Sequence, residues 1–223
     1  MNFTTPKRAD KGREIALAAL DQFTQKGFVS ASLEHIAAAA GIGKSTIYEY
    51  FKNKEELFVA AVEETMEMWF NDIRKICDRT ADPIERLEII ASEFLVCEGD
   101  CPPSTQRFFF EILMQTIMEG GVFYNRKHYI REVHQKFIRT IADILLAGVS
   151  RGQLKPVIAR DADKIAIAYL SFLDGMMLNS LIAGGYIDVK LQIAFFLQNL
   201  APLLRSGQSG DIAAARAAMP EES

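Results

Sequence analysis

The chain has 223 residues, 49% of them hydrophobic, which is enough for one large or two modest domains with a sizeable core. Its formal net charge of −4 is unevenly distributed, because residues 1–54 hold eight Lys/Arg and five Asp/Glu whereas residues 55–223 hold 17 and 24. A basic first segment before an acidic body is typical of a protein whose N-terminal part meets nucleic acid, although short segments also differ by a few charges by chance.

The cysteine count and the hydropathy pattern favour a reducing, aqueous compartment. Three cysteines are too few and too scattered for a disulfide framework, so we interpret them as structural thiols. Cys97 and Cys101 lie four residues apart, but no adjacent Cys or His completes a metal site, and the three histidines are scattered. No run of about 18 apolar residues predicts a membrane span and no signal peptide opens the chain. We therefore expect a cytoplasmic protein with no membrane contact, no metal and no cofactor.

The first predicted elements are three short helices. Residues 10–26 repeat apolar side chains at the spacing of one helix face, and Gly27 is expected to end this helix in the left-handed conformation. A second helix follows until Gly41 breaks it, and a third begins at about Gly43. The inward-facing positions of the second helix are Leu33, Ile36, Ala37 and Ala40. Two short helices joined by a glycine-containing turn are typical of a helix-turn-helix.

The third predicted helix and its flanks carry residue types that suit a DNA groove. A glycine turn, small polar side chains, two tyrosines and two lysines occur in one continuous stretch, residues 41–58. Lysine ammonium groups and tyrosine hydroxyls meet phosphates, while small polar side chains approach base edges. We expect the backbone contacts from Tyr48, Tyr50 and Lys54. The candidates nearer the bases are Lys44, Ser45 and Thr46.

These residues resemble the tetracycline-repressor (TetR) family of bacterial regulators over roughly the first quarter of the chain. The resembling positions are Arg13, Ile15, Ala16, Ala19, Phe23, Gly27, Phe28, Ser32, Ile36, Ala37, Ala40, Gly41, Ile42, Lys44, Thr46, Tyr48, Phe51, Lys54, Glu55 and Leu57. The resemblance implies an all-α protein with a three-helix DNA-binding head, residues 1–54, and a helical ligand-binding and dimerisation domain, residues 55–205. It also implies a regulator that is probably a repressor by family habit, not by its residues.

Three positions depart from the family pattern. Ala31 stands where members usually carry a Thr that caps the second helix and touches phosphate, so Ser30 or Ser32 would have to serve, and Ser32 joins the candidate DNA contacts. Gly43 replaces a common Ser but remains an acceptable helix cap. Glu49 is unfavourable near phosphates but can accept a hydrogen bond from a cytosine amino group. These departures bear on the operator sequence more than on DNA binding.

A long fourth helix is predicted to link the head to the body. Asn53 and Glu56 form a capping pair that starts it, and it should run from about Lys54 to Arg79. Its apolar stripe consists of Phe58, Val62, Thr65, Trp69 and Ile73, with Met66 and Phe70 beside it. Because its start belongs to the head and its end to the body, a ligand near Trp69 is expected to act on DNA binding through this helix.

Further helices are predicted along the rest of the body. Asp82 and Pro83 open one, and a break follows over Gly99–Pro103. A helix around Phe108–Ile117 is expected to reach Gly120-Gly121, and a long one spans about Phe123 to Val149. The last two helices are predicted over residues 161–183 and 188–205, and residues 206–223 read as a flexible tail.

The last two predicted helices are apolar over more than one face, which indicates burial on all sides. In a chain of this length, such a terminal pair favours burial against a second copy, so we expect a homodimer. A two-fold dimer presents two heads and therefore requires a near-palindromic operator in double-stranded DNA.

Aromatic and methionine side chains in the body favour a pocket for a hydrophobic or aromatic effector, with ordinary core packing as the alternative. The candidate effector contacts are Met66, Trp69, Phe70, Ile73, Phe94, Phe109, Met114, Phe137, Asp174 and Met177. Asp174 lies within an apolar run, where a buried carboxylate would need a ligand or dimer partner; local exposure is the alternative.

No nucleophile elbow, phosphate loop, zinc-peptidase motif or redox pair is found, so the chain is not expected to be an enzyme. The alternative function is a helical module that sequesters a hydrophobic ligand and uses its head to dock a protein. Salt dependence separates the two, because binding to DNA through several lysines weakens steeply with salt.

Overall fold

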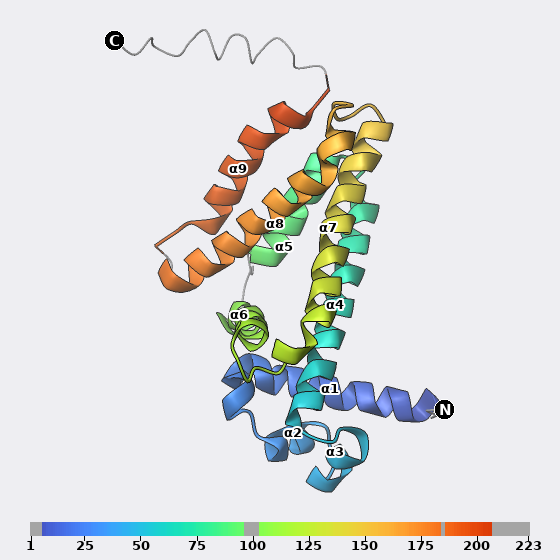
Figure 1. Cartoon of the computed structure of the whole chain (residues 1–223), viewed down its shortest axis with the longest axis vertical. Helices are drawn as coiled ribbons and strands as arrows, with labels where there is room; N and C mark the ends of the chain where they lie inside the picture. The colour runs from blue at the N-terminus through green and yellow to red at the C-terminus, as the bar shows by residue number, and fades with distance from the viewer. Residues whose placement is uncertain (1–5, 96–102, 184–185, 207–223) are drawn as a thin grey trace. The chain divides into compact units, whose positions relative to one another are not determined.

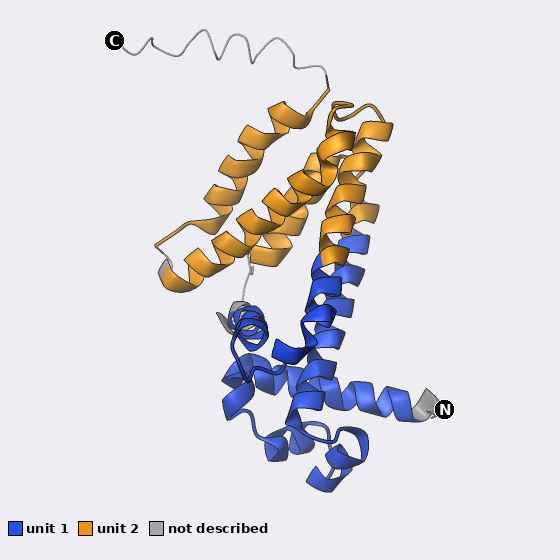
Figure 2. Ribbon diagram, viewed as in Figure 1, with its two compact units in different colours: residues 1–75, 97–134 blue, residues 76–96, 135–223 orange. Residues whose placement is uncertain are grey.

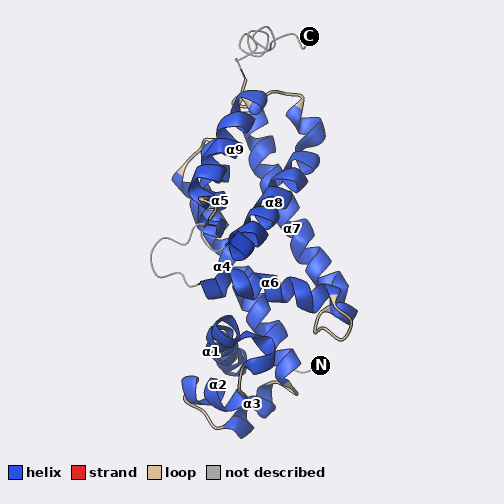
Figure 3. Cartoon of the chain, turned by 90° about the vertical axis from the view of Figure 1, so that its left-hand side faces the viewer, coloured by secondary structure: helices blue, strands red, loops and turns tan. Residues whose placement is uncertain are grey.

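The computed structural model describes residues 6–95, 103–183 and 186–206, and within them the regular elements are helices (Figures 1 and 3). In chain order they are α1 Pro6–Ser30, α2 Leu33–Ala39, α3 Lys44–Tyr50, α4 Lys54–Arg79, α5 Pro83–Leu95, α6 Pro103–Ile117, the 3-10 helix η1 Tyr124–Arg126, α7 Lys127–Ser150, α8 Ile158–Ala183 and α9 Val189–Leu204. The predicted all-α fold class is confirmed.

Two compact units divide the chain (Figure 2). Unit 1 comprises residues 1–75 and 97–134, and unit 2 comprises residues 76–96 and 135–223. Helices α4 and α7 each contribute residues to both units. The division of the chain at residues 54 and 205 stays a prediction, and the predicted tail lies, from residue 207 on, outside the described residues, as do Cys97, Cys101 and most of the break expected before α6.

Helix α1 is the central element of unit 1. It contacts α6 and α2, and α2 in turn contacts α3. Figures 1 and 3 show α6 on one side of α1 and the pair α2–α3 on the other. The helix-turn-helix therefore shares a core with α6, an element of the predicted body.

Aromatic rings fill this core around Phe58 of α4. The centroid of its ring lies 5.0 Å from that of Phe23, 4.9 Å from that of Phe28, 5.8 Å from that of Phe108 and 5.9 Å from that of Phe123. These separations are those of favourable tilted and edge-to-face pairs. Because the five rings come from α1, α4, α6 and the turn after α6, one cluster ties these elements together.

Gly27 interrupts α1 with φ 76° and ψ 165°, a conformation that is essentially restricted to glycine. The interruption leaves the N–H of Phe28 available, and Oε1 of Glu111 in α6 accepts its hydrogen bond at 2.6 Å. The predicted positive φ at Gly27 is confirmed, although helical residues resume after it as far as Ser30.

The start of α4 follows the prediction closely. Oδ1 of Asn53 accepts a hydrogen bond from the N–H of Glu56 at 2.8 Å, as a capping residue should. The Glu56 carboxylate reaches back to the N–H of Lys52 at 2.9 Å, one residue before the one that a standard capping box would use.

Unit 2 is held by polar contacts as well as by its apolar core. The buried Tyr169 of α8 donates its hydroxyl to the backbone oxygen of Leu87 in α5 at 2.5 Å. Asp82 caps α5, because its Oδ1 accepts from the N–H groups of Ile84 at 2.8 Å and Glu85 at 3.1 Å. The same carboxylate pairs with both terminal nitrogens of the Arg205 guanidinium, at 2.8 and 3.1 Å.

The C-terminal end of α9 is fixed to the turn between α7 and α8. Leu154 and Arg205 form an isolated antiparallel bridge, and the N–H of Lys155 donates to the oxygen of Leu204 at 2.9 Å. The Lys155 ammonium also donates to the oxygen of Leu203 at 2.9 Å. We call these contacts, with the Asp82–Arg205 ion pair, the C-terminal clasp.

Three helix boundaries differ from the predictions. Helix α6 ends at Ile117 rather than at the glycine pair, because Gly120 adopts φ 83° and the chain turns back until the N–H of Phe123 reaches the oxygen of Gln115 at 3.0 Å. This turn also separates η1 from α7, which the sequence analysis joined into one helix. Helix α8 begins at Ile158, three residues early, directly after the turn that contains Pro156.

Helices α8 and α9 were predicted to be buried on all sides, but within one protomer they are not. The exposed large apolar side chains on these two helices are Ile167, Leu178, Ile182, Leu191, Phe195 and Leu203. Residues Ile158–Ile182 are also long and apolar enough to cross a membrane, by length and composition only, with a mean hydropathy of 1.6. The sequence analysis missed this because Asp174 interrupts the apolar run; a core helix meets the same criterion.

Candidate nucleic-acid interface

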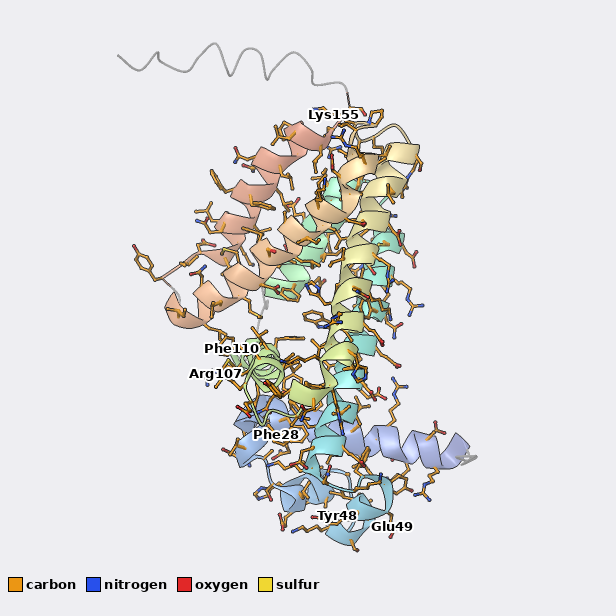
Figure 4. All side chains as sticks on the ribbon, viewed as in Figure 1. Phe28, Tyr48, Glu49, Arg107, Phe110 and Lys155 are labelled. Atoms are coloured by element: carbon orange, nitrogen blue, oxygen red, sulfur yellow. The ribbon has the colours of Figure 1, made fainter. Side chains whose placement is uncertain are left out.

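Helix α3 buries one residue and presents several predicted DNA contacts to solvent. Ile47 is buried in the core of unit 1, whereas Lys44, Ser45 and Tyr48 are exposed, Tyr48 to 51%. Figure 4 labels Tyr48 and Glu49 on this helix. Positions 44, 45 and 48 share one side of a helix, so the structure brings these three candidates together. Thr46 and Tyr50 are half-buried beside them.

Lys44 and Ser32 are joined by a residue that the sequence analysis did not select. The ammonium of Lys44 is bonded to Oε1 of Glu34, and the hydroxyl of Ser32 donates to Oε2 of the same carboxylate at 2.8 Å. These hydrogen bonds, from Lys44 first and Ser32 second, lower the pKa of Glu34 to about 2. Two predicted DNA contacts thus share one ionised carboxylate in the free protein.

Tyr50 lies at the end of α3 next to Arg8 of α1. The guanidinium carbon of Arg8 is 5.3 Å from the centroid of the Tyr50 ring, and Nη2 of Arg8 donates to the backbone oxygen of Glu49 at 2.6 Å. Arg8 was another residue that the sequence analysis overlooked. Its only signal there was membership of the basic N-terminal segment, because the contact depends on how α1 crosses α3.

Lys54 is engaged with the end of α1. Its ammonium donates to the backbone oxygen of Val29 at 3.0 Å and lies 5.0 Å from the centroid of the Phe28 ring. Burial lowers the pKa of this ammonium. Lys54 therefore holds the segment after Gly27 from one side, while Glu111 holds it from the other at the N–H of Phe28.

The candidate effector contacts divide between the two units. In unit 1 the rings of Trp69 and Phe109 have centroids 4.1 Å apart, with an interplanar angle of 33°. Met66, Phe70 and Ile73 of the same unit are buried on α4. Met114 of α6 is half-buried.

In unit 2, Met177 is buried and Phe94 and Phe137 are half-buried. Asp174 is exposed on α8 within one protomer, which agrees with the alternative that the sequence analysis had considered for it. Among the described residues there is no group of three or more His, Cys, Asp or Glu side chains that could hold a metal ion.

Comparisons with known proteins agree with this geometry. The family described as "Bacterial regulatory proteins, tetR family" matches residues 15–61, and the family described as "Tetracyclin repressor-like, C-terminal domain" matches residues 106–188. The first match covers α2 and α3, and the second covers α7 and most of α6 and α8.

Curated relatives include the HTH-type transcriptional regulator RutR of Escherichia coli K12, 32% identical over 49% of this chain and 53% of that protein. The chain thus spans about half the length of the first curated relatives that it matches. The fatty acid metabolism regulator protein of Bacillus subtilis is 25% identical over 67% of this chain and 73% of that protein.

Among solved structures, a TetR transcription regulator from Haloarcula marismortui has a TM-score of 0.71 at 19% identity, covering 89% of this chain and all of that one. The regulator FadR from Bacillus subtilis in complex with stearoyl-CoA has a TM-score of 0.66 at 22% identity, covering 84% and 96%. Both show the fold. The reported relatives are transcriptional regulators, which confirms the expectation that the chain is not an enzyme.

Proposed function

Because this chain belongs to the TetR family of transcriptional regulators, we propose that it binds double-stranded DNA through α2 and α3. The observation that carries the proposal is the surface of α3, which exposes Lys44, Ser45 and Tyr48 while Ile47 anchors the helix in the core. A recognition helix needs this division between a fixed inner face and a polar outer face. Ser32, Thr46, Tyr50 and Lys54 complete the proposed contact set.

The DNA contacts are tested with two substitutions and a matched control. Lys44→Ala should change sequence preference, since loss of a lysine–guanine contact lowers affinity for the preferred sequence by about five- to a hundredfold. Lys54→Ala should weaken all duplexes alike and reduce the slope of log affinity against log salt by about one. The control is Lys75→Ala, which removes an exposed lysine of α4 outside the proposed interface. Fluorescence anisotropy with a selected operator measures all three, and unchanged binding by both test variants would refute the proposal.

We further propose a homodimer that reads a near-palindromic operator and resides in the cytoplasm. The exposed apolar side chains of α8 and α9 support self-association, because an apolar surface of this kind favours burial against another chain. Half-site centres about 34–36 Å apart, or a multiple, suit successive turns of the major groove.

The effector is proposed to be a hydrophobic small molecule that enters the body and releases the protein from its operator. Support comes from the apolar side chains around Trp69 and Phe109, and from relatives named as fatty acid regulators, one of them crystallised with stearoyl-CoA. Ring contacts run within unit 1 from Trp69 through Phe109, Phe108 and Phe58 to Phe28 beneath Lys54. A ligand near Trp69 would thereby bias the head.

Linkage tests this effector proposal. Trp69 is the only tryptophan, so its fluorescence reports binding of stearoyl-CoA, with free coenzyme A as the control. Operator DNA should weaken stearoyl-CoA binding by the same factor as stearoyl-CoA weakens operator binding, about 5- to 150-fold for a coupling of ~1–3 kcal/mol. Equal ligand affinities with and without operator would mean that effector and DNA sites are uncoupled. Failure of stearoyl-CoA to bind would reject this effector class and leave DNA binding intact.

A protein-docking head with a ligand-sequestering body is the second candidate function. The apolar surface of α8 and α9 is the observation that favours it. Retention of head-dependent binding at high salt would support it, because docking of an apolar surface lacks the counterion release that makes DNA binding salt-sensitive.

A further inference from the structure

We propose that Glu34 competes with DNA for Lys44 and Ser32, and so sets how tightly the head holds DNA of any sequence. The inference rests on the proposed DNA-binding function. It assigns to a residue of α2 the role of a built-in competitor: its carboxylate occupies, in the free protein, the donors that a phosphate or base would take.

The geometry shows one carboxylate satisfying two donors from separate elements. Glu34 stands in the first turn of α2, Ser32 is the cap residue before that helix, and Lys44 is the first residue of α3. Each oxygen of Glu34 accepts from a different donor, Oε1 from the Lys44 ammonium and Oε2 from the Ser32 hydroxyl at 2.8 Å. The Ser32 side chain makes no capping hydrogen bond to α2, so its hydroxyl is directed to the carboxylate instead.

The charge state of this group is fixed at physiological pH. Hydrogen bonds from Lys44 and Ser32 keep the carboxyl ionised far below neutral pH, and the pKa of Lys44 is raised mainly by its hydrogen bond with Glu34. The pair is therefore a full positive charge neutralised by a full negative one. A phosphate approaching Lys44 meets that negative charge first.

The pair is also exposed, which allows DNA to displace it. The side chains of Lys44 and Glu34 are 47% and 62% exposed. Ion pairs in solvent are weak, so a well-placed phosphate or guanine can take the lysine at small cost, whereas a poorly placed one gains little from the exchange. Competition of this kind lowers non-specific binding more than it lowers binding to a matched operator.

An opposite role for the same contacts would be positioning. If Glu34 held Lys44 in the orientation that reads DNA, removal of the carboxylate would weaken binding rather than strengthen it. The two roles predict opposite signs for the same substitution, which makes the inference decidable by one affinity measurement.

The test uses the full chain and a duplex of mixed sequence, so that no operator needs to be known. Glu34→Gln keeps the size of the side chain and removes the charge. We expect affinity for the duplex to rise by about two- to fivefold at low salt, with the slope of log affinity against log salt steeper by up to about one, because one more lysine becomes free to release a counterion. Glu34→Ala should change affinity in the same direction, and thermal unfolding checks that both variants remain folded.

Two controls separate local competition from the change in net charge. Asp72→Asn removes the carboxylate of another exposed lysine pair, with Lys75 in α4 at 2.7 Å, and should leave affinity within the error. In a Lys44→Ala background, Glu34→Gln should lose most of its gain, because the competed ammonium is gone.

The outcomes distinguish this inference from the function on which it rests. A Glu34→Gln variant that binds the duplex as tightly as the parent, or less tightly, overturns the competition. A gain matched by Asp72→Asn, or kept in full without Lys44, also overturns it, since it would come from net charge alone. If the parent chain binds no duplex at low salt, the DNA-binding function itself fails.

Discussion

The backbone at Gly27 is the point where α1, α6 and α4 meet in unit 1. Glu111 of α6 accepts from the N–H of Phe28, and Lys54 of α4 donates to the oxygen of Val29. A carboxylate and an ammonium thus bind adjacent peptide groups that the interruption of α1 leaves open. Hydrogen bonds to charged groups are stronger than neutral ones, so this short segment is well fixed.

Gly27→Ala is expected to destabilise unit 1. Its φ of 76° is a conformation that side chains rarely adopt, and an added Cβ would lie 3.0 Å from Oε2 of Glu111. The expected loss is about 1–3 kcal/mol, measured by urea unfolding. Gly12→Ala, in the same helix, is the control: its Cβ would meet only Cδ1 of Tyr50 at 3.7 Å, so stability should rise by about 0.5–1 kcal/mol. A neutral Gly27→Ala would mean that the observed φ is not required.

At the scale of single elements, helix α5 depends on a cap that doubles as an ion pair. Burial raises the pKa of Asp82, but hydrogen bonds from Arg205 and from the N–H groups of Glu85 and Ile84 outweigh it, and the pKa is lowered overall. A lowered pKa means that the folded state favours the charged carboxylate. This stabilisation is present above the unfolded pKa of about 3.9 and is lost as pH falls through the folded pKa.

Asp82→Asn is therefore expected to destabilise the protein by about 1 kcal/mol at pH 7, a value that allows for the partial exposure of both partners. The difference from the parent chain should shrink below about pH 4, where Asp82 of the parent also becomes neutral. Chemical unfolding at pH 7 and at pH 3 measures it. The control Asp143→Asn, at an exposed position of α7, should stay within about 0.5 kcal/mol of the parent. A pH-independent difference would show that the cap acts without its charge.

Sequence predicted the elements whose signals are local. Helix α4 has the predicted bounds because Asn53 and Glu56 mark its start within four residues, and the fold class follows from apolar periodicity. The end of α6 was missed because it depends on Phe123 folding back to Gln115, and the Lys44–Glu34 pair was missed because its members are ten residues apart on different helices. Contacts set by tertiary packing leave no such local signal.

At the scale of the whole molecule, α8 and α9 carry the prediction of self-association. Phe195 of α9 is 64% exposed, and a charge placed there would be buried without a partner in a dimer. Phe195→Glu should therefore weaken self-association by at least about tenfold, as measured by sedimentation velocity over a range of concentrations. Ile117→Glu on α6 is the matched control, since Ile117 is 55% exposed but lies outside these helices. Equal effects of the two substitutions would exclude α8 and α9 as the specific interface.

The C-terminal clasp makes the two units finish folding at different times during synthesis. Arg205 joins Asp82, which precedes it by 123 residues, and at about 5–20 residues per second the ribosome needs roughly 6–25 s to cover that interval. Unit 1 has all of its chain once residue 134 has emerged, so the DNA-reading part can fold on a nascent chain whose remaining part is still incomplete. A stop codon a few residues before Arg205 would thus spare unit 1 and deprive unit 2 of its last fastening.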